Sequence, residues 1–211
     1  MSFEVAVRRR LGPRTIEARF SAASGLAVLF GPSGSGKTSI LNMIAGLLRP
    51  DSGHVSVGGT TLFDSDDRID LAPERRRLGY VFQDGRLFPH RKVRNNLLYG
   101  FRLAEPERRW MAFERATAFL GIGHLLDRWP ATLSGGEAQR VAIGRALLAG
   151  SRALLMDEPL ASLDAPRKEE ILEVVASVRD TLDIPILYVT HDEKEAERLG
   201  AAMIMIGDQW R

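Results

Sequence analysis

The sequence predicts an α/β fold with a mostly parallel central sheet, an antiparallel β part near the N-terminus and an inserted helical part. Unbroken apolar runs alternate with helical patterns, and such strands are covered on both faces, as in a parallel sheet with flanking helices. Over 3–7 and 15–20 apolar and polar residues instead alternate, which is typical of an antiparallel hairpin with one wet face. The unbroken runs are 26–30, 153–156 and 186–189.

The composition is that of one globular domain with a substantial core. The 211 residues are 45% apolar and 27% charged, and the net charge is +2, so the overall charge does not indicate a nucleic-acid partner. Cysteine is absent, which excludes disulfides and thiolate metal sites. The first residues lack the basic segment and following apolar segment of a signal peptide. No stretch of the sequence approaches the ~18 apolar residues that a membrane-spanning helix needs. We therefore expect a soluble chain that can act at a membrane only through a partner protein.

We expect a single domain over 1–211. Within it, an antiparallel β subdomain covers about 1–30 and 50–65, and a helical subdomain covers about 90–150. The pattern from Pro106 to Leu126 predicts a helical insertion, and Gly85 with Pro89 predicts an exposed loop. The other expected elements are a strand at 78–82, helices at 135–149 and 165–182, and a last strand at 202–206.

A glycine-rich loop follows the first unbroken run and precedes a helical pattern. It has the form G-x-x-x-x-G-K-T, whose backbone N–H groups and following helix start form a concave site for a triphosphate. Lys37 is expected along the β- and γ-phosphates, and the Thr38 hydroxyl on Mg²⁺. A plain Gly/Ser turn is the alternative, and it leaves the lysine and the hydroxyl unexplained. The candidate binding residues are Gly31, Pro32, Ser33, Gly34, Ser35, Gly36, Lys37, Thr38 and Ser39.

Further polar groups follow other strands, and parallel strands bring their carboxyl ends to one edge. Asp157 is expected to hold Mg²⁺ or its water, and Glu158 to polarise the attacking water. His191 could contact the γ-phosphate. For the two acids the alternative is a solvated strand end or a helix cap. For His191 it is a residue that merely precedes a helix, because Asp192 and Glu195 have the spacing of a capping box.

A second anion site is expected at Ser134, Gly135, Gly136 and Glu137. The Ser and Glu have capping-box spacing, but capping does not explain the paired glycines, which let a phosphate approach the helix N–H groups. Since the chain already has a complete phosphate loop, this second site is expected to serve the nucleotide of another copy across a two-fold axis.

These residues resemble the ATP-binding cassette (ABC) ATPases over nearly the whole chain. Residues 31–38 look like Walker A and 133–140 like the signature, which is specific to this family. The resemblance implies a RecA-like P-loop NTPase core and a head-to-tail dimer that holds two ATP molecules with Mg²⁺. It implies that Thr38, Gln83 and Asp157 hold the metal and that Glu158, His191 and Gln83 are catalytic. The signature residues and Asp164, in a D-loop at 162–164, are then expected to reach the partner's ATP.

The order of motifs resembles the bacterial importer branch. Residues 71–77, 79–90, 93–97 and 159–164 look most like the molybdate importer ATPases, although sulfate and other oxyanion importers have similar stretches. The resemblance implies integral membrane permease subunits, which would dock at the loop 83–90 and the helical insertion, and indirectly a periplasmic solute-binding protein. It implies a place at the cytoplasmic face of the inner membrane and no nucleic acid.

The chain departs from the family in two ways. Where the family usually has an aromatic residue for adenine, this chain offers Arg8, Arg9, Arg10 and Leu11; an arginine plane could stack instead. Many molybdate importer ATPases also carry a C-terminal oxyanion-binding domain, which a chain ending at Arg211 is expected to lack, naturally or by truncation. Three alternatives stay open: an importer for sulfate, tungstate or another solute, a cassette ATPase acting on DNA or ribosomes, and a P-loop small-molecule kinase.

Overall fold

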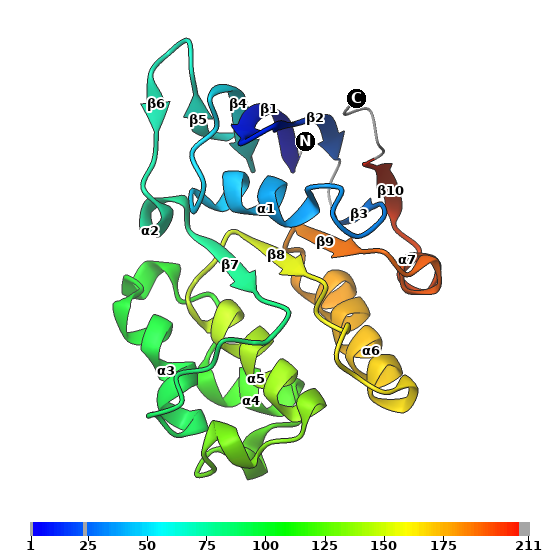
Figure 1. The fold of residues 1–211 in the computed structure, drawn as a ribbon. Coiled ribbons are helices and arrows are strands. Elements are labelled where there is room, and N and C mark those ends of the chain that lie inside the picture. Colours follow the sequence, from blue (N-terminus) through cyan, green and yellow to red (C-terminus); the bar gives the residue numbers. More distant parts are fainter. Residues whose placement is uncertain (1, 23–24, 207–211) are drawn as a thin grey trace.

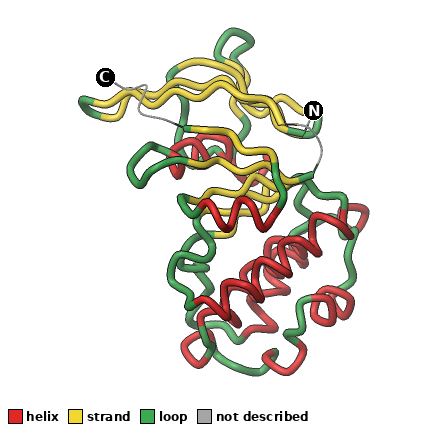
Figure 2. Tube along the Cα trace, turned by 90° about the vertical axis from the view of Figure 1, so that its right-hand side faces the viewer, coloured by secondary structure: helices red, strands yellow, loops and turns green. Residues whose placement is uncertain are grey.

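The computed structural model describes residues 2–22 and 25–206, so Arg211 lies outside the described residues. It contains two five-stranded sheets and a group of helices. Figure 1 shows the first helix, α1 (Lys37–Ala45), between the two sheets, and Figure 2 shows the helical group below them. No helix in this described part of the chain has both the length and the apolar character that crossing a bilayer requires.

The antiparallel sheet has the order β2-β1-β4-β5-β6. The expected N-terminal hairpin is confirmed and is longer than the sequence indicated, because all nine residues of β1 pair with β2. The backbones of β1 and β4 approach closely at Gly53, where only glycine fits, because a Cβ there would lie 1.9 Å from the carbonyl oxygen of Ala6. The strands are β1 (Phe3–Leu11), β2 (Arg14–Ala22), β4 (Ser52–Val57), β5 (Thr60–Asp64) and β6 (Ile69–Asp70).

The parallel sheet has the order β10-β3-β9-β8-β7, and every neighbouring pair is parallel. The run at 26–30 belongs to this parallel sheet, so the first segment of the antiparallel subdomain ends before residue 30. The second segment of that subdomain extends past residue 65, because it includes β6. The unbroken apolar runs thus form buried parallel strands, as expected. They are β3 (Leu26–Phe30), β7 (Leu78–Val81), β8 (Ala153–Asp157), β9 (Ile186–Thr190) and β10 (Ala202–Met205).

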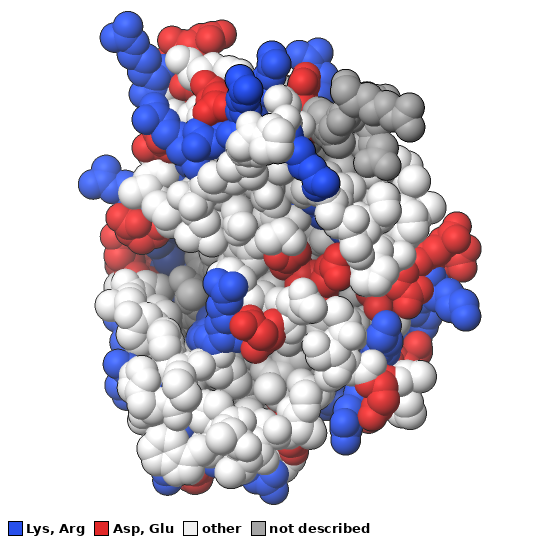
Figure 3. Space-filling model, viewed as in Figure 1, with Lys and Arg blue, Asp and Glu red and all other residues white. Residues whose placement is uncertain are grey.

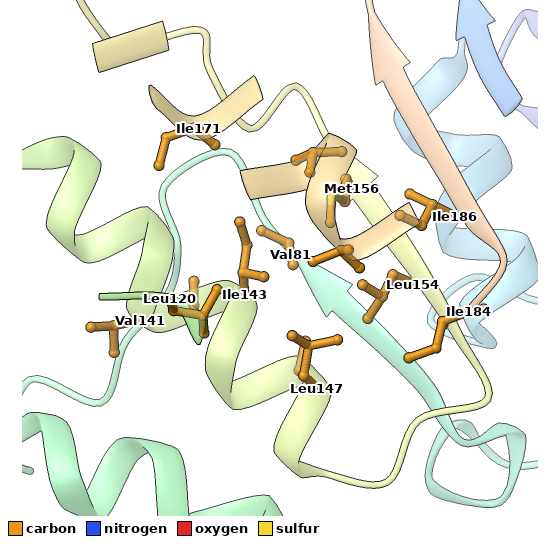
Figure 4. Close-up of a cluster of buried hydrophobic side chains, with 14 of the residues drawn as sticks. Val81, Leu120, Val141, Ile143, Leu147, Leu154, Met156, Ile171, Ile184 and Ile186 are labelled. Atoms are coloured by element: carbon orange, nitrogen blue, oxygen red, sulfur yellow. The ribbon is translucent and has the colours of Figure 1, made fainter. Parts of the chain in front are cut away.

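Successive side chains of the parallel strands enter two different cores. Leu154 and Met156 of β8 pack with the helices α5 (Gly135–Leu148) and α6 (Ala165–Leu182), as Figure 4 shows for the side of α5. Leu155 between them packs toward α1 and the antiparallel sheet. Since side chains alternate along a strand, the parallel sheet is the wall that both cores share.

The expected helical insertion is present, in short pieces. Within 106–126 only α4 (Phe113–Phe119) is α-helical, and short 3₁₀ turns lie at Pro106–Arg108 and Gly123–Leu125. Gly121 ends the helix with a φ of 65°, a conformation that glycine adopts without strain. The group also contains α3 (Val93–Leu103), which packs on α5, and a 3₁₀ turn at Pro130–Thr132. The remaining helices are α2 (Pro73–Arg76) and α7 (Glu193–Leu199).

A buried arginine joins α1 to the segment before β7. Arg76 has no exposed surface, and its guanidinium donates to the carbonyls of Leu71, Met43 and Ile44 and to the carboxylate of Asp70. Met43 and Ile44 stand in the last turn of α1, where carbonyls lack the usual helical partner four residues on; the Met43 carbonyl also accepts from the N–H of Gly46. Arg76 thus satisfies the end of the helix that starts at the phosphate loop.

Charge on the surface is mixed in sign. Figure 3 shows Lys and Arg side chains over the antiparallel sheet at the top of the view, next to acidic ones. Arg9 pairs there with Asp51 at 2.6 Å, and Arg49 with Asp70 at 3.3 Å. The arginine run at 8–10 is therefore partly neutralised by neighbours that are distant in sequence.

Candidate nucleotide-binding and catalytic site

The phosphate loop runs from β3 into α1, as the sequence predicted. Gly36 is the helix N-cap, with a φ of 91°, and only a residue without a Cβ turns there without strain. The side chain of Lys37 is 3% exposed, and its Nζ donates to the carbonyls of Gly31 and Pro32 at 2.8 and 2.9 Å. The lysine therefore lies inside the loop that the motif predicts for phosphate.

Thr38 and Asp157 meet across 119 positions of sequence. The Thr38 hydroxyl donates to Oδ1 of Asp157 at 3.0 Å, and the Tyr80 hydroxyl donates to Oδ2 at 3.2 Å. Burial raises the pKa of Asp157, and the hydrogen bonds from Thr38 and Tyr80 oppose that rise. A hydroxyl and a carboxylate are hard oxygen donors, the set that Mg²⁺ takes together with substrate phosphates. The donor set therefore fits the expected metal.

Glu158 is held between two other loops. Its Oε1 lies 3.5 Å from Nζ of Lys37, and its Oε2 lies 3.1 Å from Nδ1 of His191. The Glu158 backbone has a φ of 43°, a left-handed conformation that is uncommon for a residue with a side chain and is found in functional sites. The structure thus brings together the three strand ends that carry Lys37, Glu158 and His191.

The helix that follows His191, α7, carries a buried carboxylate, that of Glu195. Glu195 is 5% exposed and accepts hydrogen bonds from Tyr188 and Thr190 on β9 and from Lys168 on α6. The capping box expected for Asp192 and Glu195 is therefore wrong: Asp192 caps α7 through the N–H of Lys194, while Glu195 turns to the strand. The only sign of this contact in the sequence is that an acidic residue, Glu195, comes shortly after a buried strand.

Gln83 lies exposed in the loop that follows β7. This loop is fixed to the helical group just beyond it. Arg145 of α5 donates to the carbonyls of Gly85 and Arg86 at 2.8 and 2.7 Å, and the buried Asn96 of α3 bonds both the N–H and the carbonyl of Phe88. Sequence reasoning missed both residues, since an arginine and an asparagine in helices give no pattern.

The second expected anion site lies elsewhere on the same chain. Ser134 and Glu137 form the capping box at the start of α5, and the N–H of Ser134 lowers the pKa of Glu137. Ser134, Gly136 and Glu137 line a hollow of about 290 Å³ with residues of the helical group and α6. Asp164 caps α6 by accepting from Arg167. The phosphate loop borders a different hollow.

That other hollow, about 600 Å³, joins the phosphate loop to the tip of the β1–β2 hairpin. Of the four residues offered for adenine, only Leu11 lines it. Arg9 binds Asp51, and the side chain of Arg10 donates to the carbonyl of Gly12. The sequence missed Arg14 and Ile16, which line the hollow from the neighbouring strand.

The sheet, the phosphate loop and the grouped strand ends are those of a P-loop NTPase cassette. Residues 19–161 match the model of the ABC transporter family, and the chain belongs to that family.

The chain is similar over nearly its whole length to proteins named molybdenum import ATP-binding protein ModC. It is 53% identical to that of Paramagnetospirillum magneticum over 203 residues and 54% identical to that of Rhizobium meliloti over 206 residues. These matches cover 96% and 98% of this chain but 56% and 58% of the relatives. The chain thus spans a little over half the length of the curated relatives it matches.

Two solved structures share the fold at 26% identity and a TM-score of 0.74. One is cbiO1 from Clostridium perfringens, part of the ABC transporter complex cbiONQ, with 90% of this chain and 78% of that chain covered. The other is a bacterial ABC transporter cassette solved as a dimer, with 98% and 94% covered.

Proposed function

We propose that this chain is the ATP-hydrolysing subunit of an ABC importer and couples ATP hydrolysis to uptake of molybdate. The observation that carries the chemistry is the carboxylate of Glu158, which stands beside Lys37 of the phosphate loop and His191. The identity of more than 50% to molybdenum import ATP-binding proteins supports the solute. The same similarity disfavours a cassette that acts on nucleic acid or ribosomes.

Each residue has a role in the proposed ATPase. Lys37 and the loop N–H groups bind the β- and γ-phosphates. Thr38, Asp157 and Gln83 hold Mg²⁺, which when bound neutralises charge on the transferred phosphoryl group. Glu158 orients the attacking water and accepts its proton, and His191 contacts the γ-phosphate.

We infer that a second copy completes each site. Ser134 and Gly136 line a hollow separate from that of the phosphate loop, so the two can hold one nucleotide only if they come from different copies. In this head-to-tail dimer Asp164 also reaches the partner's ATP. The dimer would act on membrane permease subunits at the cytoplasmic face of the inner membrane, fed by a periplasmic solute-binding protein.

The test is uptake by proteoliposomes that contain the permease and this chain, with the solute-binding protein supplied outside. We expect molybdate uptake that requires internal ATP and Mg²⁺ and is lost when Glu158→Gln replaces the natural chain. Sulfate and tungstate are offered in parallel. Uptake of sulfate without molybdate would correct the solute, and uptake that survives the variant would refute the proposed motor.

A further inference from the structure

A tight turn of the backbone sets the position of His191. The His191 side chain is 48% exposed and hydrogen-bonds Glu158 across the site. The residues on either side of it are joined directly, because the N–H of Asp192 donates to the hydroxyl oxygen of Thr190 at 3.0 Å. A bond from an N–H to the threonine hydroxyl two residues before it closes a turn, and His191 is the central residue of that turn. The Thr190 hydroxyl therefore sets the direction in which the imidazole leaves β9.

A hydroxyl turn of this kind is weak on its own, and here a carboxylate fixes it. Thr190 is 2% exposed, and its hydroxyl donates to Oε2 of Glu195 at 2.8 Å. Because the hydroxyl has one proton, which the carboxylate takes, its lone pairs remain for the N–H of Asp192. A hydrogen bond to an ionised group is about twice as strong as one between neutral groups. Glu195 thus orients and polarises the oxygen that closes the turn.

The Glu195 carboxylate is itself held at both oxygens. Oε2 accepts a second hydrogen bond, from the Tyr188 hydroxyl at 3.0 Å, and Oε1 accepts from Nζ of Lys168 at 3.0 Å. One side chain of α7 is therefore bonded to both β9 and α6. Replacing a buried ion pair by apolar residues is often neutral for stability, so stability alone does not account for this carboxylate.

We propose that Glu195 is a positioning residue for His191, because through the Thr190 hydroxyl it fixes the turn that holds the imidazole toward the terminal phosphate. The inference rests on the proposed function, in which His191 contacts the γ-phosphate. Glu195 is buried and acts only through Thr190. When the bond between them is lost, the nucleotide still binds at the phosphate loop, but His191 is displaced from it. A displacement of about 1 Å in a reacting group costs on the order of 10²-fold in rate.

The test measures ATP hydrolysis and ATP binding by Thr190→Val, which keeps the branched shape of the side chain without its hydroxyl. We expect kcat to fall by about ten- to hundredfold, while the dissociation constant for ATP, which the phosphate loop determines, stays nearly unchanged. Thr190→Ser keeps the hydroxyl and should have a kcat close to that of the natural chain. An unchanged kcat in Thr190→Val would refute the inference and leave the ATPase standing.

Two variants assign the effect to the carboxylate. Glu195→Gln replaces the charged acceptor by a neutral one and should lower kcat by about three- to tenfold. Tyr188→Phe is the matched control, because it removes a bond to the same oxygen of Glu195 but leaves the turn intact. It should lower the thermal stability about as much as Thr190→Val and leave kcat unchanged. An unchanged kcat in Glu195→Gln, or an equal loss of kcat in Tyr188→Phe, would overturn the role given to Glu195.

A double variant shows whether the effect passes through His191. His191→Ala removes the side chain that the turn holds, so adding Thr190→Val to it should lower kcat by less than about twofold, since two changes that act through one group do not add. Full additivity would overturn the inference. Unchanged hydrolysis in His191→Ala alone would refute the role of His191 in the proposed function, and the inference with it.

Discussion

Nδ1 of His191 lies 3.1 Å from Oε2 of Glu158, although the two residues end different strands and are 33 positions apart. The other oxygen of Glu158 faces Lys37 at 3.5 Å. One carboxylate is therefore shared by two groups that are both proposed to bind the terminal phosphate. A nucleotide that takes Lys37 and His191 as partners frees Glu158 to act on water.

This arrangement predicts the effect of Glu158→Gln. The amide keeps the size of the side chain but does not accept a proton from water, so hydrolysis should fall by about 10²- to 10⁴-fold while ATP binding persists. The bound but uncleaved nucleotide should accumulate a dimer. Phosphate release, nucleotide binding and size-exclusion chromatography measure the three effects. Undiminished turnover would show that Glu158 is not the hydrolytic residue.

The second prediction concerns the half-site at Ser134. Ser134→Arg should bind ATP as a monomer but fail to hydrolyse it, because the bulky side chain fills the approach to the helix N–H groups. Lys37→Ala should fail at the phosphate loop. A mixture of the two inactive variants should regain part of the activity, since their heterodimer contains one intact composite site.

Ser134→Asn is the control for folding, because asparagine is as good an N-cap as serine. It should leave the thermal stability of the chain nearly unchanged. A comparison with this variant therefore distinguishes an effect of losing the α5 cap from an effect on the anion site. A mixture of Ser134→Arg and Lys37→Ala that stays inactive would contradict a site shared between copies.

Arg76 predicts a large effect on stability at a distance from the nucleotide. Arg76→Met removes hydrogen bonds to three backbone carbonyls, of which that of Met43 keeps the N–H of Gly46. The acceptors left unsatisfied should lower the free energy of unfolding by about 3 kcal/mol. Urea unfolding measures it. The exposed neighbour Arg75 in the same turn is the matched control, and Arg75→Met should change stability by less than ~0.5 kcal/mol. Equal losses for both variants would contradict the role given to Arg76.

Asp157 predicts a pH dependence of stability. Because burial raises its pKa in the folded chain, the fold favours the neutral acid, so its contribution to stability is present at acid pH and is lost as pH rises through the raised value. Asp157→Asn should therefore be more stable than the natural chain near neutral pH, and the difference should vanish in acid. The variant should also lose Mg²⁺-dependent hydrolysis.

Urea unfolding of both chains at the two pH values, without nucleotide, tests this prediction. The Tyr80 hydroxyl keeps an acceptor in the variant, since Oδ1 of Asn42 lies 3.1 Å away. If Asp157→Asn were less stable than the natural chain near neutral pH, this would contradict the claim that the buried charge of Asp157 opposes folding.

The local patterns of the sequence predicted the strands and the phosphate loop because both depend on near neighbours. Apolar runs predicted β3, β8 and β9, and the motif at 31–38 lies on the expected turn between strand and helix. The helical pattern from Pro106 predicted the insertion, but the α-helix there covers only Phe113–Phe119, and Gly121 turns the chain left-handed just after it.

Long-range polar contacts were the part that the sequence did not reveal. Glu195 has the spacing of a capping residue, yet its carboxylate is taken by Tyr188 and Thr190, because satisfying a buried hydroxyl outweighs capping an exposed helix end. Tyr80 has the pattern of a plain strand residue, and its bond to Asp157 spans 77 positions. Such pairs follow from the order of strands in the sheet, which no single segment specifies.

The bonds from Arg145 and Asn96 make the segment after Gln83 a stiff link. Its far end is anchored to α5 and α3, so only the short stretch between β7 and Gly85 remains to absorb strain. We therefore expect any displacement of Gln83 to be passed on to α5 and α3 through these bonds rather than taken up within the segment itself.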